Sequence, residues 1–392
     1  MDIKQLRAET PGCLHKIHLN NAGAALMPLP VLAAIQAHLE LEATVGGYEA
    51  HKQKSAEIQG TYTALARYLN CTPEEVALTS SATDAYARAL SSIPFEPGDM
   101  ILTTESDYAS NQIAFLSLKK RFGVRIERFA NGPGGQIEVG AFNLAIAALK
   151  PRLVAVTHVP TNSGLVQPIA EVGQECRKQD VLFLVDACQS AGQLPLDVQA
   201  IGCDFLTATF RKFLRGPRGM GFMYVSNRVL EKGLEPLFID MRGADWIGEE
   251  RYLSNPTARR FEDWEFPYAL VLGAKAATEY MLEIGPEKIA ARNRELCGYL
   301  REKLSRIPGL VLLDQGQELC SIVTVFHHHH TPEALQQYLF LQNINTSVSG
   351  LTAALIDFEK KGVPGALRLS PHYYNTMEEL DATIHTLAIV KG

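Results

Sequence analysis

Short, continuous apolar runs recur along the first two thirds of the chain, and segments with helical periodicity separate them. Runs of this kind are typical of strands that are buried on both faces of a mostly parallel sheet. Two predicted helices, 28–42 and 53–69, precede the first run and are joined by a predicted loop at 46–49. The predicted strands are 76–79, 100–104, 124–129, 153–158 and 181–185. The pattern therefore predicts an α/β domain with helices over both faces of its sheet.

Polar residues gather at the positions where these strands end. In a parallel sheet, ligands bind beyond the carboxyl ends of the strands, so polar pairs that follow different strands are expected to meet. The pairs are Ser81 with Thr83, Asp107 with Tyr108, Thr161 with Asn162, Asp186 with Gln189, and Thr209 with Lys212. We therefore predict one shared site at this edge of the sheet.

The pattern changes after about residue 270, where longer helices and mixed elements replace the regular alternation. The predicted helices are 266–284, 286–306, 332–341 and 377–390, and the predicted strands are 311–313, 321–326 and 367–370. We predict a large domain over 18–270. A smaller α+β domain is predicted to combine 1–17 with 271–392.

Composition and charge narrow the function classes. The chain has 392 residues and a net charge of −6, which gives no electrostatic reason to expect nucleic acid or an anionic membrane as a partner. No apolar run is long enough to span a bilayer, and the N-terminus lacks the layout of a secretory signal. Seven scattered cysteines without a CxxC pair favour a reducing, cytoplasmic setting. The histidine run 327–330 is predicted to be a solvated loop and not a metal site, because adjacent side chains cannot all face one ion.

Lys212 is the first candidate for chemistry. It follows a predicted buried strand and lies between Phe210 and Phe213, where an apolar rim lowers the pKa of an amine enough for a Schiff base. The alternative is a surface lysine at a strand end. Asp186 ends another apolar strand and is suited to pair with a cationic ring nitrogen, unless it caps a helix or pairs with an arginine. Gln189 could donate to an oxygen on the same ring.

A predicted helix start at 80–84 is rich in hydroxyl groups. It is either an ordinary N-cap or a phosphate cradle that uses backbone N–H groups, Thr83 and the helix dipole. Thr209 and Arg211 would complete the cradle with a hydroxyl and a positive charge. Arg368, among apolar neighbours, is either a structural ion-pair residue or a clamp for a substrate carboxylate.

Together and in this order, three motifs resemble the class V aminotransferase family of pyridoxal-phosphate enzymes. That family includes cysteine desulfurases, C–S lyases, isopenicillin-N-epimerase-like proteins and kynureninases. The motifs are Val185-Asp-Ala-Cys-Gln189, Thr209-Phe-Arg-Lys-Phe-Leu-Arg-Gly-Pro-Arg-Gly219 and Leu367-Arg-Leu-Ser-Pro-His-Tyr-Tyr-Asn-Thr376. The resemblance runs from about Leu19 to Leu387. It implies fold type I with a mostly parallel, seven-stranded type of sheet, and a homodimer with active sites at the subunit interface.

The resemblance also implies a role for individual residues. Lys212 would hold pyridoxal 5′-phosphate as an internal aldimine, Asp186 would pair with the ring nitrogen, and Gln189 would bind near the ring oxygen. The other implied cofactor-binding positions are Ala82, Thr83, Thr209 and Arg211 at the phosphate, Tyr108 where many members place a stacking histidine, and Thr161 or Asn162 beside the ring oxygen. The implied substrate-binding residue is Arg368, and Gly23, Tyr48 and His372 are predicted around the substrate.

One departure from the family pattern bears on the reaction. Desulfurases carry a mobile cysteine shortly before the carboxylate-binding arginine, but 347–368 contains none and the last cysteine is Cys320. Cys188 is expected on the opposite side of its strand from Asp186, as a small core residue. The prediction is an amino-acid substrate, an external aldimine and a quinonoid, followed by β-elimination of the C–S lyase type. Class V aminotransferase or epimerase chemistry is the alternative, and a non-catalytic cofactor-binding protein is a remote one.

Overall fold

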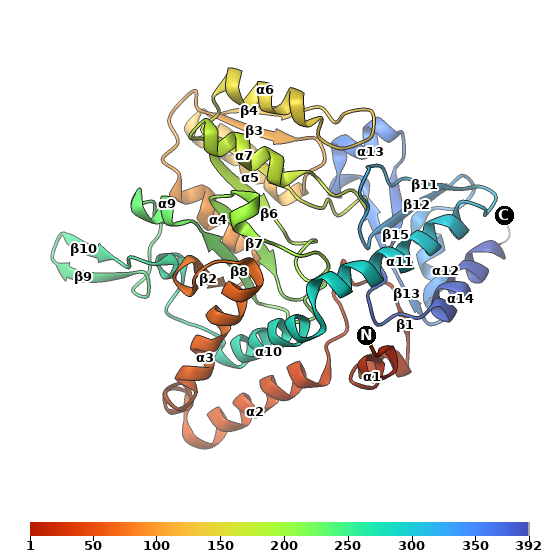
Figure 1. Cartoon of the computed structure of the whole chain (residues 1–392), viewed down its shortest axis with the longest axis horizontal. Coiled ribbons are helices and arrows are strands. Elements are labelled where there is room, and N and C mark those ends of the chain that lie inside the picture. Colours follow the sequence, from red (N-terminus) through yellow and green to blue (C-terminus); the bar gives the residue numbers. More distant parts are fainter. Residues whose placement is uncertain (391–392) are drawn as a thin grey trace.

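The computed structural model describes residues 1–390, and a seven-stranded sheet forms its centre (Figure 1). The strand order is β2-β8-β7-β6-β5-β3-β4, and the pairs are parallel except those that β8 makes with β2 and β7. The strands are β2 (Val76–Thr79), β3 (Met100–Thr104), β4 (Arg125–Phe129), β5 (Leu153–Thr157), β6 (Leu182–Asp186), β7 (Phe205–Thr209) and β8 (Gly221–Val225). This mostly parallel sheet confirms the predicted α/β fold class.

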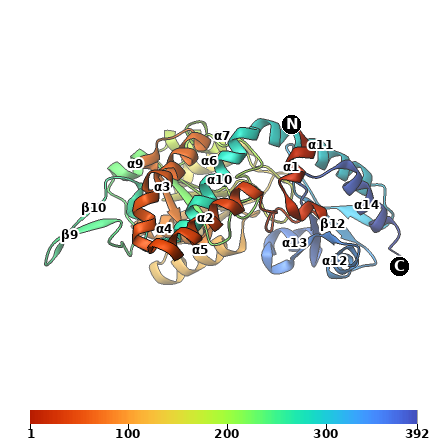
Figure 2. The same ribbon diagram turned by 90° about the horizontal axis from the view of Figure 1, so that it is seen from below.

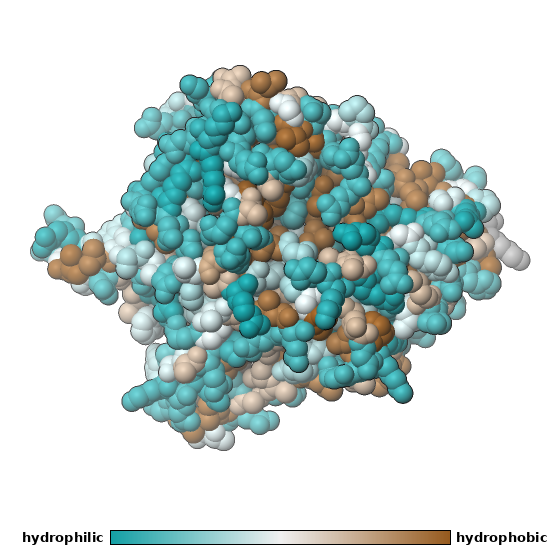
Figure 3. All heavy atoms as spheres, viewed as in Figure 1, coloured by the Kyte–Doolittle hydropathy of each residue, from teal (hydrophilic) through white to brown (hydrophobic). Residues whose placement is uncertain are grey.

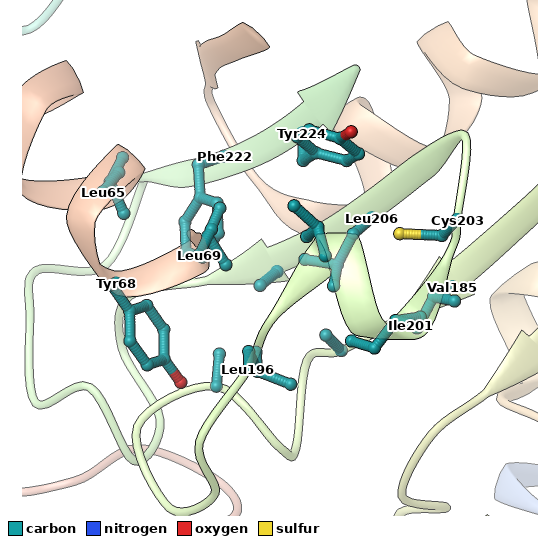
Figure 4. Packing of buried hydrophobic residues seen from close by; sticks show 14 of the residues in the cluster. Leu65, Tyr68, Leu69, Val185, Leu196, Ile201, Cys203, Leu206, Phe222 and Tyr224 are labelled. Carbon is teal, nitrogen blue, oxygen red and sulfur yellow. The ribbon is translucent and has the colours of Figure 1, made fainter. Parts of the chain in front are cut away.

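Helices cover both faces of the sheet because alternate residues of each central strand enter two separate cores. In β6, Phe183 and Val185 belong to one core, and Leu182 and Leu184 to the other. Figure 4 shows part of the first core, where Leu65 and neighbouring side chains pack on the sheet. The helices of the first face are α3 (Gly47–Leu69), α6 (Val139–Leu149), α7 (Ile169–Lys178), α8 (Val198–Ile201) and α10 (Tyr268–Ile284). The second face is covered by α4 (Ala82–Ser92), α5 (Ala109–Phe122) and α9 (Asn227–Glu231).

A second, four-stranded antiparallel sheet lies in the C-terminal third, in the order β11-β12-β15-β14. Its strands are β11 (Leu310–Leu312), β12 (Val323–His327), β14 (Ser347–Gly350) and β15 (Gly365–Leu369). Its helices are α11 (Pro286–Leu304), α12 (Pro332–Leu341), α13 (Leu355–Lys361) and α14 (Met377–Ala388). This arrangement is the α+β unit that the sequence pattern predicts for this part of the chain.

The N-terminus packs on this C-terminal unit (Figure 2). Helix α1 (Ile3–Ala8) is joined to α14 by an ion pair between Arg7 and Glu379, with 2.8 Å between Nη2 and Oε1. Strand β1 (Ile17–His18) pairs in parallel with β13 (Ile344–Asn345). The two ends of the chain therefore belong to one packed unit.

The predicted division at residue 270 stays a prediction, and it falls inside α10. This helix packs against α3 and against α2 (Leu29–Val45), which both precede the sheet in the chain. The surface that α10 shares with these helices joins it to the large sheet more than to the four-stranded one.

Several predicted elements differ from the structure. The expected loop at 46–49 is wrong, because α3 begins at Gly47 and the turn is made by Gly46 alone, with φ of +98°. Strands β8 and β14 were not predicted. His327 is the buried last residue of β12 and not part of a solvated loop.

A hairpin of β9 (Ala244–Gly248) and β10 (Arg251–Ser254) projects from the large domain (Figure 1). Apolar atoms lie at its surface, as Figure 3 shows. The exposed apolar side chains are Trp246, Ile247, Tyr252 and Leu253. Among residues 1–390, none of the helices has the length and apolar character needed to cross a membrane.

Candidate active site

One cavity lies beyond the carboxyl ends of β5, β6 and β7, at the start of α4. It is lined by every predicted cofactor-binding residue except Asn162. The lining residues are Ser81, Ala82, Thr83, Tyr108, Thr157, Val159, Thr161, Asp186, Cys188, Gln189, Thr209, Arg211 and Lys212. The polar residues that follow separate strands therefore do meet at one edge of the sheet.

Lys212 is buried in this cavity, three residues after β7 ends. Burial lowers the pKa of its amine, and the nearby Arg211 and Arg368 lower it further, whereas Asp186 opposes the shift. A lowered pKa increases the fraction of neutral amine, which is the form that can attack a carbonyl carbon or accept a proton. The side chain therefore has the properties of a Schiff-base lysine.

Asp186 is the last residue of β6 and is buried. Its Oδ1 accepts a hydrogen bond from the Cys188 backbone N–H at 2.9 Å, and its Oδ2 accepts one from Asn111 Nδ2 at 3.0 Å. No lysine or arginine forms an ion pair with this carboxylate within residues 1–390. A buried carboxylate with only neutral donors is suited to a cationic ligand atom.

The start of α4 forms one wall of the cavity. Ala82 and Thr83 are its first residues, and N–H groups at this position have no intrahelical acceptor. Gly221 of β8 lies against this helix start, since a Cβ there would approach the Ser81 carbonyl carbon to 2.4 Å. Arg211 adds a positive charge, and its guanidinium donates to the Gly23 carbonyl. These groups are the donor set that a phosphate needs.

Arg368 of β15 contacts a residue of the cavity wall, Thr161, from the small sheet. Its Nη1 donates to Oγ1 and to the carbonyl of Thr161, at 2.5 and 3.2 Å. Its Nε is buried without a partner. Burial lowers the pKa of this guanidinium to about 10, and Arg211 adds to the shift. A buried cation with an unused donor is expected to accept a carboxylate.

The structure distinguishes Thr161 from Asn162. Gln189 Nε2 donates to Thr161 Oγ1 at 3.1 Å, and Gln189 Oε1 is buried without a partner. Asn162 points elsewhere, because its Nδ2 donates to Asp357 of α13 at 2.7 Å. Thr161 and Gln189 therefore face the cavity together, and Asn162 does not.

Tyr48 and His372, which are predicted around the substrate, do not line this cavity, and their role stays a prediction. Tyr48 is 78% exposed in the first turn of α3. His372 is fully buried, and its Nε2 lies 2.8 Å from the Phe213 carbonyl while Nδ1 lies 3.2 Å from Asn293 Nδ2. Both ring nitrogens of His372 are thus engaged by the protein. Gly23 does not line the cavity either, but its carbonyl accepts a hydrogen bond from Arg211, which does.

The expectation for Cys188 is wrong, because its side chain lines the cavity. The alternation of side chains between the two faces of a strand does not extend to Cys188, since β6 ends at Asp186 and the chain turns there. Burial raises the pKa of the Cys188 thiol, and Asp186 raises it further, so the thiol stays protonated. Sequence reasoning also missed Asn111, which lies in the first turn of α5, four residues after Asp107.

Comparison with known proteins decides the family. The profile of the aminotransferase class-V family matches residues 17–383. This chain belongs to the aminotransferase class-V family. A probable cysteine desulfurase of Methanothermobacter thermautotrophicus is 27% identical over 398 residues, covering 100% of this chain and 99% of the relative. Isopenicillin N epimerase of Streptomyces clavuligerus is 28% identical, covering 84% and 83%.

A solved structure shows the same fold. It is the complex of the cystine C–S lyase C-DES with its reaction product cysteine persulfide, and it superposes with a TM-score of 0.85 at 24% identity. The superposition covers 97% of this chain and 99% of that one. Membership of the aminotransferase class-V family thus confirms a fold type I enzyme, a lyase or transferase, with pyridoxal 5′-phosphate as its cofactor.

The residues of the cavity have the chemistry that this cofactor requires. Lys212 can form the covalent link, the start of α4 with Arg211 can bind a phosphate, and Asp186 offers a carboxylate for a ring nitrogen. Gln189 Oε1 and Arg368 Nε are further buried polar atoms without a protein partner, and both could bind a ligand. The individual binding roles stay predictions.

Proposed function

We propose that this aminotransferase class-V enzyme catalyses β-elimination on an amino acid that carries a sulfur leaving group at Cβ. The observation that carries the proposal is that Lys212 and Asp186 line one cavity, that Arg368 is bonded to Thr161 of its wall, and that the segment before Arg368 is free of cysteine. In the structure that segment is occupied by β14, α13 and β15, and it contains no nucleophilic thiol. The only thiol lining the cavity, Cys188, is kept protonated.

The chain's own residues supply binding and proton transfer. Bound pyridoxal phosphate supplies an electron sink that stabilises negative charge at the substrate Cα. Arg368 binds the substrate α-carboxylate with its fork of N–H groups, which orients the Cα–H bond toward Lys212. The neutral Lys212 amine then takes the Cα proton as a general base. Because these groups are buried, water is kept from the reacting atoms.

Elimination requires only that the leaving group departs from Cβ after this proton is removed. Transamination and epimerisation would use the same Lys212 and differ in where a proton is returned. Aminotransferase or epimerase chemistry is therefore the alternative, and the similarity to isopenicillin N epimerase supports keeping it. A substrate with a good Cβ leaving group separates the outcomes.

The test incubates the holoenzyme with cystine, cysteine S-conjugates and their sulfoxides, and measures pyruvate and ammonia. We expect both products in equal amounts, and none with Lys212→Ala, which should also lose the visible absorbance of the bound cofactor. Cys320→Ser, a matched change at the last cysteine before Arg368, should retain the activity. Amino transfer to a 2-oxo acid without pyruvate would overturn elimination in favour of transamination.

A homodimer with active sites at the subunit interface is part of the same proposal. Its support is the projecting β9–β10 hairpin, whose apolar side chains are exposed in the single chain. A cytoplasmic location is also proposed, since all seven cysteines are free thiols, as a reducing compartment would keep them.

A further inference from the structure

A second buried carboxylate lies behind Asp186 and belongs to none of the roles described so far. Asp107 follows β3 and immediately precedes Tyr108, and it is 5% exposed. It does not line the cavity, whereas Asp186 does. Neither carboxylate forms an ion pair within residues 1–390. Two buried carboxylates without a cationic partner carry a large desolvation cost, which calls for a physical reason.

Asn111 connects the two carboxylates. Its Nδ2 donates to Asp107 Oδ1 at 3.0 Å and to Asp186 Oδ2 at 3.0 Å. Thr157 Oγ1 also lies 3.4 Å from this nitrogen, but the two carboxylates are closer and charged, so each of its two hydrogens is assigned to one carboxylate. The opposite orientation of the amide would turn its oxygen toward two carboxylates, and repulsion excludes it. Asn111 is 4% exposed, so no water competes for these hydrogens.

The contacts of Asp107 favour its ionised form. The Tyr108 backbone N–H and Gln112 Nε2 donate to it at 2.7 and 2.8 Å, in addition to Asn111. The Thr157 and Thr103 hydroxyls also donate to it, at 2.5 and 3.2 Å. The three nitrogens can only donate, and the ionised carboxylate is the form that accepts from all five groups. Burial raises the pKa of Asp107, Asp186 adds to the rise, and the hydrogen bonds oppose it. Tyr86 of α4 faces both carboxylates, and burial together with their charges raises the pKa of its phenol.

We propose that Asp107 is a positioning residue that acts through Asn111 on Asp186. By accepting one Asn111 hydrogen it aims the other at Asp186 Oδ2, which fixes the carboxylate that the cofactor ring nitrogen is to meet. Its own negative charge, in the low-dielectric interior, raises the proton affinity of that ring nitrogen. The pair of carboxylates thus keeps the ring nitrogen protonated, which is the state that withdraws electrons from Cα. The proposal rests on the cofactor and not on which reaction follows Cα deprotonation.

The test follows the ring nitrogen directly. The holoenzyme is prepared with ¹⁵N-labelled pyridoxal 5′-phosphate, and the ring ¹⁵N resonance is followed as a function of pH. We expect Asp107→Asn to lower the midpoint of ring deprotonation by about one pH unit, which is tenfold in proton affinity. Asp107→Glu, which keeps the charge, should restore part of the shift. Asp180→Asn is the matched control, since Asp180 is exposed near the other end of β6. The midpoint of ring deprotonation in this variant should equal that of the unchanged protein.

An unchanged midpoint in Asp107→Asn would overturn the proposal, whatever the activity of the variant with amino acids. If that variant fails to fold, neutron diffraction from the unchanged holoenzyme decides the question. The expected result is no deuterium on Asp107, one Asn111 deuterium toward each carboxylate, and a deuterated ring nitrogen. A deuterium on Asp107 would overturn the proposal. Because neither measurement uses turnover, a failure of the elimination chemistry is distinguishable from a failure here.

Discussion

At the scale of single residues, positive charge accumulates at the cavity. Lys212 and Arg368 are buried, Arg211 is partly buried, and Asp186 is the carboxylate that lines the same space. Burial lowers the pKa of each of these three cations. Cations that are desolvated in this way are stabilised when an anion binds, so the cavity favours the binding of a phosphate and a carboxylate.

Arg368 gives the first prediction. Arg368→Ala should raise KM for the amino-acid substrate by about ten- to a hundredfold, because hydrogen bonds to charged groups contribute about 1.5–3 kcal/mol. The KM of Arg368→Lys should lie between the values of the unchanged enzyme and of Arg368→Ala, since an ammonium group cannot form the planar fork. Steady-state kinetics measure the effect, with Arg67→Ala on the exposed end of α3 as the control. Equal KM values for the unchanged enzyme and Arg368→Ala would contradict the carboxylate role.

His158 gives a prediction about pH. Burial lowers its pKa from an ordinary value near 6.5 to about 4, so the unfolded chain binds a proton that the folded protein does not. Stability is therefore lost as pH falls from about 6.5 toward 4. From pH 7 to pH 5 the loss from this residue should be about 2 kcal/mol. Urea unfolding at both pH values measures this loss, and the free energy of unfolding of His158→Leu should depend less on pH than that of the unchanged protein. An identical pH dependence in both proteins would show that His158 is not the cause.

At the scale of elements, the segment after Lys212 is fixed by the small domain and the N-terminus together. Arg215 is fully buried with φ of +60°, and its guanidinium donates to Leu26 O, to Tyr373 Oη and to Thr10 Oγ1 at 2.6–2.9 Å. Its charge also lies over the Tyr374 ring, 4.5 Å from the centroid. One side chain thus joins three parts of the chain close to Lys212.

Arg215→Lys tests this junction without changing the charge or the backbone preference. A lysine reaches at most one of the three acceptors, so we expect the free energy of unfolding to fall by about 3 kcal/mol. Denaturant unfolding monitored by circular dichroism measures the change. Arg67→Lys, an exposed substitution of the same kind, should stay within about 0.5 kcal/mol of the unchanged protein. A similarly small effect for Arg215→Lys would mean that the junction contributes little to stability.

The elements that the sequence predicted share a clear physical signal. Strands such as β5 and β6 are apolar at every position but the last because both faces are buried, and they were found close to their true bounds. β14 was missed because its sequence, Ser-Val-Ser-Gly, has neither a continuous apolar run nor a long alternation. β8 was missed because it follows a glycine-rich turn and pairs antiparallel within a parallel sheet. Within the site, the sequence predicted which residue types gather at the cavity. It could not predict that the His372 ring does not line the cavity, because this depends on contacts with Phe213 and Asn293, which are far away in the sequence.

At the scale of the whole molecule, two contacts bring α13 of the small domain against the large domain. Lys360 pairs with Glu105, and Asp357 accepts a hydrogen bond from Asn162 at 2.7 Å. This helix lies in the cysteine-free segment that precedes Arg368. In this chain the stretch is tied to the large domain by polar contacts.

The projecting hairpin gives the prediction for assembly. Trp246 and Leu253 are 81% and 61% exposed, and large apolar residues of this kind often dominate interfaces. We expect the protein to be a dimer in sedimentation velocity, and the double change Trp246→Ser with Leu253→Ser to weaken dimerisation at least about tenfold, since a buried tryptophan contributes more than 1.4 kcal/mol. Leu144→Ser, an exposed apolar position on α6, is the control. An unchanged dimerisation constant would place the interface elsewhere.

The parallel pairing of β1 with β13 has a consequence for synthesis of the chain. Ile17 is synthesised before the whole of the large sheet, and its partner Ile344 follows more than three hundred residues later. The Asn20–Ser370 bridge closes later still. Until then the N-terminal segment has no strand to join, although the large sheet is complete by Val225. The nascent chain therefore carries residues 17–18 unpaired while the large sheet is being made, and a chaperone that binds short extended segments would find them there.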